Sequence, residues 1–228
     1  GDRAAGEYGP LLCSLLQHNG IPRSAISGAV FCTVVPPLVP VFQDVCIRYL
    51  DTRPLVIEPG IKTGLRLAVE SPKELGPDRV ANVVAGTRLY GRPLIVIDFG
   101  TATTFDVVSM NGDFLGGAIA PGITIASEAL FSRTAMLPRI ELVCPKHAIG
   151  HGTVAAMQSG IMYGYIGLIE RILKEIVDEL GVQPHIIATG GYADMFTRVV
   201  PSIQVSNPDL SLIGLRLLYE MNKIDGKT

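Results

Sequence analysis

Apolar residues in this chain fall into short runs bounded by Gly and Pro and into longer stretches with helical spacing. The short runs predict strands at 29–35, 54–57, 94–97, 103–108, 114–120 and 184–189. The helical spacing predicts helices at 7–19, 40–50, 78–90, 124–131, 153–180 and 210–222. Strands followed by helices occur on both sides of Gly91. This repetition predicts an α/β fold of two similar half-domains, residues 1–90 and 91–228, with a cleft between them.

The strand at 94–97 is followed by a carboxylate, a glycine and three hydroxyl groups, in the sequence Asp98-Phe99-Gly100-Thr101-Ala102-Thr103-Thr104. Asp98 is expected at the end of the strand, where a ligand can reach it. Gly100 allows close approach of backbone to an oxyanion. The threonine hydroxyls can donate to phosphate oxygens, and Asp98 can hold a cation against them. The alternative is a strand that ends in a Thr-rich turn.

The residues after this segment favour phosphate binding. Asn111-Gly112 is a strong hairpin signal because both positions tolerate positive φ, so the strands at 94–97, 103–108 and 114–120 are predicted to form an antiparallel meander. A Rossmann or P-loop site would pass from strand to helix instead, and the chain has neither glycine motif. A β-hairpin that holds phosphates is typical of the acetate kinase, sugar kinase, Hsp70 and actin superfamily.

A second polar cluster is Gly76-Pro77-Asp78-Arg79, in which Gly-Pro forces a turn and Asp78 begins a helix. Asp78 could simply cap the helix, since aspartate is a favoured N-cap residue. The functional alternative makes Asp78 a general base and Arg79 an anion clamp, because the planar guanidinium binds a carboxylate with two hydrogen bonds.

Paired glycines also follow the strand at 184–189, in Thr189-Gly190-Gly191. They would let a flat ring lie against the backbone, although a plain strand-to-helix link looks the same. Their position strengthens the first interpretation, because they belong to the half of the chain that carries Asp98.

The composition of the chain bears on whether it binds nucleic acid, metal ions or membranes. The net charge of −2 provides no electrostatic footprint for nucleic acid. The four cysteines show no metal spacing and are expected to be reduced and mostly buried, as in a cytoplasmic protein. The uncharged stretch 24–43 carries three prolines, so we expect a buried strand, a turn and a helix start there. The stretch 153–169 carries three glycines, and we expect a buried helix and no membrane span.

Taken together, these motifs resemble the type III pantothenate kinase family, and the resemblance extends from about Glu7 to about Asn222. The segments that carry it stand in family order: 72–79, 98–104, 116–122, 134–138, 148–150, Thr153, 157–160 and 188–191. The resemblance implies two ribonuclease H-like, actin-like half-domains with mixed sheets flanked by helices. It also implies ATP-dependent phosphorylation of pantothenate to 4′-phosphopantothenate, the first step of coenzyme A biosynthesis.

The resemblance assigns roles to the polar clusters. Asp78 would be the catalytic base, and Arg79 would bind the pantothenate carboxylate next to Gly76. Thr153 would bind pantothenate from the other subunit of a homodimer. The ATP-binding residues would be Gly100, Thr101, Thr103, Gly190 and Gly191. Asp98 would hold a monovalent cation, potassium or ammonium, and Mg²⁺ would accompany ATP.

The chain departs from the family pattern at several places. The family opens with a strand and an Asp-x-Gly-Asn-Thr loop that binds ATP phosphates and magnesium, and the 228 residues contain no such loop. We expect that a preceding segment is omitted, and that a protein truly lacking it would have no kinase activity. Smaller departures are Val69, Pro77 and His151-Gly152.

Two other functions compete with this interpretation. Another small-molecule kinase of the superfamily would explain the Asp98 segment and the paired glycines, but it explains Gly76-Pro77-Asp78-Arg79 poorly. A non-catalytic regulatory relative would explain the absent first loop. Retention of Asp78, Arg79 and Asp98 argues against a scaffold without chemistry.

Overall fold

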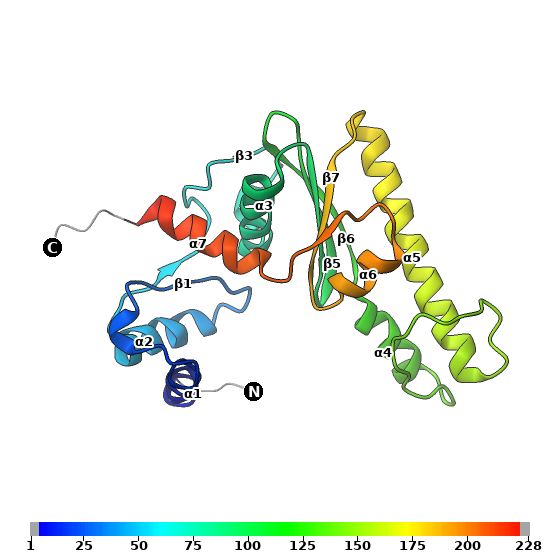
Figure 1. The fold of residues 1–228 in the computed structure, drawn as a ribbon, viewed down its shortest axis with the longest axis horizontal. Coiled ribbons are helices and arrows are strands. Elements are labelled where there is room, and N and C mark those ends of the chain that lie inside the picture. Colours follow the sequence, from blue (N-terminus) through cyan, green and yellow to red (C-terminus); the bar gives the residue numbers. More distant parts are fainter. Residues whose placement is uncertain (1–4, 224–228) are drawn as a thin grey trace.

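The structure is a computed structural model that describes residues 5–223. Its centre is a six-stranded mixed sheet in the order β3-β6-β5-β4-β7-β8 (Figure 1). The strands are β3 (Arg66–Leu67), β4 (Leu94–Phe99), β5 (Ala102–Val108), β6 (Asp113–Pro121), β7 (His185–Gly190) and β8 (Val205–Ser206). The predicted meander is confirmed, since β4, β5 and β6 pair antiparallel and β7 joins β4 in parallel.

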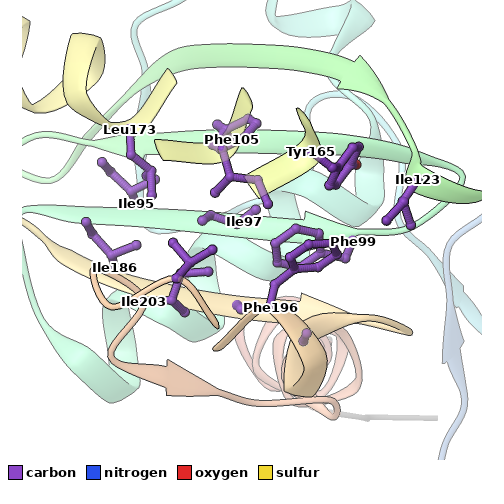
Figure 2. Close-up of a cluster of buried hydrophobic side chains, with 14 of the residues drawn as sticks. Ile95, Ile97, Phe99, Phe105, Ile123, Tyr165, Leu173, Ile186, Phe196 and Ile203 are labelled. Carbon is purple, nitrogen blue, oxygen red and sulfur yellow. The ribbon is translucent and has the colours of Figure 1, made fainter. Parts of the chain in front are cut away.

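The alternation of residues along β4 explains why helices cover both faces of the sheet. Ile95, Ile97 and Phe99 pack against α5 (Thr153–Leu180) and α6 (Ala193–Val199). Leu94 and Val96 pack against residues of α3 (Pro77–Tyr90) and α7 (Leu210–Asn222). Figure 1 shows these helix pairs on opposite sides of the sheet, and Figure 2 shows the core on the α5 side. Because both faces of β4 are buried, residues 94–97 form a continuous apolar run instead of an alternating pattern.

Helix α3 lies between the sheet and α7, and its residues from Val80 to Gly86 are all buried. The approach of α7 depends on Gly214, where an added Cβ would lie 2.0 Å from the carbonyl oxygen of Ala81. The C-terminal helix therefore packs against a helix of the predicted first half-domain. The division at residue 90 stays a prediction.

The N-terminal region consists of α1 (Ala5–His18), α2 (Leu38–Leu50) and a two-stranded parallel sheet of β1 (Val30–Phe31) and β2 (Leu55–Val56). Here the strand predicted at 29–35 was too long. The Thr33 hydroxyl accepts the backbone N–H of Val35 at 3.0 Å, and this local turn ends the strand before Pro36.

The helix at 210–222 was predicted with its observed ends, and the long helix ends at Leu180 as expected. Five short elements of the described residues were missed: β3, α6, β8 and two 3₁₀ helices, Arg23–Ala25 and Pro72–Glu74. Asn111-Gly112 does lie in the hairpin loop between β5 and β6, but only Gly112 has positive φ, at 87°. The turn therefore differs from the two-residue type that the pair suggested.

Helix α4 (Ile123–Arg133) follows the meander and lies beside the start of α5 (Figure 1). Helix α5 has 28 residues and ends at Gly181, whose φ is 64°. Over residues 5–223, none of the helices combines the length and the apolar character needed to cross a membrane. The cysteines are free, but the expectation that most are buried was wrong, since Cys46 alone is buried and Cys144 is exposed.

Candidate functional site

The register of the sheet places polar residues of two strands on the face that α3 covers. Asp98 has the same parity along β4 as Leu94 and Val96, so it points toward α3. Thr104 lies opposite Asp98 on β5, and Asp106 lies opposite Val96. Residues directly opposite each other share a face of the sheet. The strand pairing therefore gathers two carboxylates and a hydroxyl under one helix.

Asp98 is half-buried at the end of β4, as predicted. Its Oδ2 accepts a hydrogen bond of 2.9 Å from the side-chain amide of Asn82 on α3. Burial raises the pKa of Asp98, the Asn82 hydrogen bond opposes this shift, and the nearby charge of Asp78 adds to it. A carboxylate in this environment gains from a bound cation, because a positive charge would offset the cost of its burial.

The other oxygen of Asp98 faces two glycine turns. An added Cβ at Gly190 would lie 2.6 Å from Asp98 Oδ1, and one at Gly100 would lie 3.6 Å from it. Gly190 has a φ of 89° at the end of β7, beside Phe99 in the register. These glycines keep side-chain atoms away from Oδ1, where a larger residue would contact it.

Asp78 lies on the first turn of α3, but it is not the N-cap. Gly76 occupies that position and Pro77 begins the helix, which suits proline because its missing N–H has no partner there anyway. Asp78 Oδ1 accepts the backbone N–H of Arg79 at 2.9 Å. The charge of Asp78 also raises the pKa values of Asp98, Asp106 and Cys32, so its carboxylate lies close to all three.

Gly76 leaves space for the present position of the Asp78 side chain, because a Cβ at Gly76 would lie 2.5 Å from Asp78 Oδ1. The first turn of α3 and Gly76 together therefore determine the position of the Asp78 carboxylate. Asp78 is therefore not the N-cap residue, although its carboxylate accepts one of the free backbone N–H groups of the first turn.

Arg79 forms an ion pair with Asp106 beneath α3. Arg79 Nε and Nη2 lie 2.7 and 2.6 Å from Asp106 Oδ1, and Thr104 Oγ1 donates to Asp106 Oδ2 at 3.1 Å. Asp106 is fully buried. Burial raises its pKa to about 6, Arg79 and Thr104 oppose this shift, and Asp78 adds to it.

The predicted ATP-binding threonines do not lie together. Thr101 is exposed in the turn between β4 and β5, and its carbonyl accepts the backbone N–H of Gly122 at 3.1 Å. Thr103 is buried on the opposite face of the sheet, where it bonds to the hydroxyl of Tyr165 on α5. Tyr165 donates its single proton to the carbonyl of Pro121 at 3.2 Å. The Thr103 hydroxyl must therefore donate its own proton to Tyr165, and this proton is not available to a phosphate oxygen.

Thr153 is the first residue of α5 and is exposed. It lines a cavity of about 660 Å³ between α4 and α5, together with Leu130, Leu137 and Met157. Helix α5 lies on the side of the sheet away from α3 (Figure 1). Within one chain, the structure brings Asp78, Arg79, Asp98 and Gly190 together and leaves Thr153 apart from them.

Three side chains of the site were missed by sequence reasoning: Asn82, Asp106 and Ser211. Thr104 was expected to donate to phosphate, but its hydroxyl donates to Asp106. Two of the three missed residues left a signal. Asn82 follows Asp78 by one helical turn, which is the spacing of neighbours on one face. Asp106 interrupts an apolar strand at an inward position. Over residues 5–223, no group of three or more His, Cys, Asp or Glu side chains could hold a metal ion.

The sheet and the site define a class first. The order β6-β5-β4-β7-β8, with an antiparallel meander followed by parallel strands, is the ribonuclease H-like arrangement predicted for the second half of the chain. The strand order and pairing therefore place this part of the chain in the ribonuclease H-like fold class. A solved structure with this fold is that of a Campylobacter jejuni protein assigned to the Baf family of transcriptional activators. It has 20% sequence identity and a TM-score of 0.59, over 88% of this chain and 86% of that one.

Sequence comparison then identifies the family. Residues 1–175 match the model of type III pantothenate kinases. The chain is 48% identical to the type III pantothenate kinase of Geobacillus thermodenitrificans and 47% identical to that of Geobacillus kaustophilus. Each match spans 216 residues, which is 95% of this chain and 84% of the relative. The chain belongs to the type III pantothenate kinase family.

Proposed function

We propose that Asp78 is the general base of an ATP-dependent phosphorylation of pantothenate in which Arg79 binds the substrate carboxylate. Membership of the family makes the chain a kinase, and its reaction converts pantothenate to 4′-phosphopantothenate, the first step of coenzyme A biosynthesis. The family also decides against a kinase for another small molecule. The observation that carries the proposed roles is the pairing of a half-buried carboxylate and a fixed guanidinium on the first turn of α3.

An alcohol is a weak nucleophile at neutral pH, so a carboxylate must accept its proton as the new bond forms. Asp78 can do this because its Oδ2 makes no recorded hydrogen bond within the described chain, while Oδ1 is held by the helix backbone. Binding of the substrate carboxylate by Arg79 would hold the other end of pantothenate. The reaction then depends mainly on positioning and on neutralising phosphate charge.

The ATP phosphates would lie at the turn of Gly100 and Thr101, and the adenine would lie beside Gly190 and Gly191. The exposed Thr101 and the open turn support this arrangement. Asp98 would hold potassium or ammonium, because a positive charge would offset the cost of burying its carboxylate. The ion would supply positive charge close to the phosphates. Thr103 is proposed as an ATP-binding residue from the family pattern. Its hydroxyl bonds to Tyr165, so it would have to exchange this partner for a phosphate oxygen to contact ATP directly.

Thr153 is proposed to reach the pantothenate site of a second copy in a homodimer. Added Cβ atoms at Gly160, Gly164 and Gly167 on α5 would meet no heavy atom within 4 Å, so this helix has room for a close neighbour. Large apolar side chains near its start are also exposed, including Ile149 and Val154. A cytoplasmic location and the absence of nucleic acid and membrane partners stay predictions from composition.

The first test is coupled ADP release by the full-length protein with ATP, Mg²⁺, pantothenate and potassium. Asp78→Asn is expected to lower kcat by roughly 10²–10⁴-fold, which is the usual contribution of a general base. Asp178→Asn is the matched control, since Asp178 lies on the exposed surface of α5 and pairs with Lys174. Turnover that survives in Asp78→Asn would contradict the proposed base.

A mixing experiment tests the shared site. Homodimers of Asp78→Asn and of Thr153→Val are each expected to be inactive or impaired, and subunit exchange between them should restore about a quarter of wild-type activity. This estimate assumes random exchange into one intact site per mixed dimer, under the symmetry of a two-fold dimer. No recovery, with exchange verified by tagged subunits, would contradict a Thr153 that acts across the interface.

A further inference from the structure

Asp106 is a carboxylate without any exposure to water, and the reaction assigned above does not use it. A buried charge is tolerated only when it is paired and hydrogen-bonded. Asp106 meets this condition through two side chains: Arg79 contacts Oδ1 and Thr104 donates to Oδ2. Both oxygens are therefore engaged, and the carboxylate has a fixed orientation.

The orientation of Asp106 fixes in turn the orientation of Arg79. A guanidinium has five N–H donors arranged in a plane. Asp106 engages the edge formed by Nε and Nη2. The guanidinium carbon also lies 5.8 Å from the centre of the Phe114 ring, which restricts movement on one side. Within residues 5–223, no hydrogen bond is recorded for Nη1, so the edge formed by Nη1 and the second proton of Nη2 stays free.

The free edge has the geometry that a carboxylate needs. Arginine binds carboxylates through two parallel N–H···O bonds, and one guanidinium can serve two carboxylates on two edges. A side chain already held on one edge loses less conformational freedom when a ligand binds the other. The Arg79 side chain is 16% exposed, so its charged end is largely enclosed before any substrate arrives.

We infer that Asp106 is a positioning residue for substrate recognition: it holds Arg79 by the Nε–Nη2 edge so that the other edge meets the carboxylate of pantothenate. The inference rests on the proposed function of Arg79. Asp106 itself touches no substrate. Its effect is selectivity for a carboxylate-bearing substrate over an analogue that has the same reactive hydroxyl and no negative charge.

The test compares two substrates in the full-length protein: pantothenate, and pantothenyl alcohol, in which a hydroxymethyl group replaces the carboxylate. Asp106→Asn keeps the shape of the side chain and removes its charge. It is expected to raise the KM for pantothenate by roughly 10- to 100-fold, the range for a lost charge-assisted contact. The KM for ATP should stay the same and kcat should change by less than about threefold. The kcat/KM for pantothenate divided by the kcat/KM for pantothenyl alcohol should therefore fall by a similar factor.

Asp113→Asn is the matched control. Asp113 also binds an arginine through Nε and Nη2, with distances of 2.7 and 2.6 Å to Arg66, but this pair lies at the surface of β3 and β6. This variant should leave both substrates unaffected. Thr104→Val is a milder second variant that keeps the ion pair and removes one hydrogen bond. It should lower the preference for pantothenate over pantothenyl alcohol by a smaller factor. The inference can then still be tested if Asp106→Asn fails to fold.

A double-mutant cycle with Arg79→Gln completes the test. If Asp106 acts through Arg79, the double variant should lose no more selectivity than Arg79→Gln alone. Equal loss of kcat/KM for both substrates in Asp106→Asn, or additive losses in the cycle, would overturn the inference and leave Asp106 a structural residue. An Arg79→Gln variant with unchanged pantothenate KM would instead overturn the proposed role of Arg79, and the inference with it.

Discussion

The side-chain amide of Asn82 donates a hydrogen bond of 2.9 Å to Asp98 Oδ2, and this bond joins the middle of α3 to the end of β4. Asn82 is fully buried. Its Oδ1 accepts a hydrogen bond of 2.6 Å from Ser211 on α7. Because a carboxylate only accepts hydrogen bonds, the amide nitrogen must face Asp98, and the hydroxyl of Ser211 holds the amide in that orientation. The C-terminal helix thus contributes to the position of a carboxylate at the site.

The first prediction concerns this chain of bonds. Asn82→Leu removes the donor to Asp98, so the carboxylate is no longer held with Oδ1 toward the glycine turns. We expect the potassium concentration for half-maximal activity to rise by roughly tenfold, consistent with about 1–3 kcal/mol for a lost buried partner. Ser211→Ala keeps the donor and should cause a smaller shift. Unchanged potassium dependence in a folded Asn82→Leu protein would refute a cation role that depends on this orientation.

Gly190→Ala is predicted to harm both folding and activity. The added Cβ would lie 2.6 Å from Asp98 Oδ1 and 2.7 Å from the backbone of Phe99, at a φ of 89° that disfavours alanine. Two strand ends must then separate, which we expect to cost about 1–3 kcal/mol of unfolding free energy. Gly191→Ala is the control for stability, because its Cβ would meet no heavy atom within 4 Å. The measurement is urea unfolding of both variants. Equal unfolding midpoints would contradict the close contact of Gly190 with Asp98 and Phe99.

The stability of the protein should depend on pH through Asp106. Burial raises its pKa from 3.8 to about 6, so the folded protein holds this proton over a range in which the unfolded chain has released it. The stabilising contribution of the protonated group is complete below pH 3.8 and is lost as pH rises toward 6. The unfolding free energy of wild type minus that of Asp106→Asn should therefore fall between about pH 4 and pH 6.

This difference isolates Asp106 from other groups. The pKa of Asp98 is also raised, but Asp98 is present in both proteins and cancels. Asp113, whose pKa is lowered by Arg66, cancels in the same way. Urea titrations at four pH values across the window would measure the difference. A difference independent of pH would show that the pKa of Asp106 is not raised by its burial.

Tyr165→Phe is predicted to destabilise the meander. The tyrosine hydroxyl bonds to Thr103 and to the carbonyl of Pro121, which belong to β5 and β6. Its removal leaves the buried Thr103 hydroxyl without its partner, at a cost of about 1–3 kcal/mol. Tyr163→Phe is the matched control, since its hydroxyl bonds to the Pro145 carbonyl at an exposed position and should matter by less than about 0.5 kcal/mol. Thermal unfolding of the two variants measures the effect. Equal losses of unfolding free energy would show that the buried hydrogen bond contributes no more than the exposed one.

Much of the architecture followed from local signals in the sequence. The apolar run at 94–97, the hairpin signal at Asn111-Gly112 and the long helical pattern at 153–180 each specify a structure over a few neighbouring residues. The strands and helices that they predict were found with small errors in their ends. The elements that were missed, such as β3 and β8, have only two residues each and owe their pairing to strands far away in the sequence.

The sequence by itself determined the family, the meander, and the carboxylates and glycines of the motifs, because each depends on residues close together in the chain. Only the tertiary structure decided what these residues contact. The parity of two paired strands turns Asp106 toward Arg79 and turns Thr103 away to Tyr165. The packing of α7 on α3 brings Ser211 to Asn82, across 129 positions of the chain. Such contacts depend on strand register and helix packing, which local propensity does not encode.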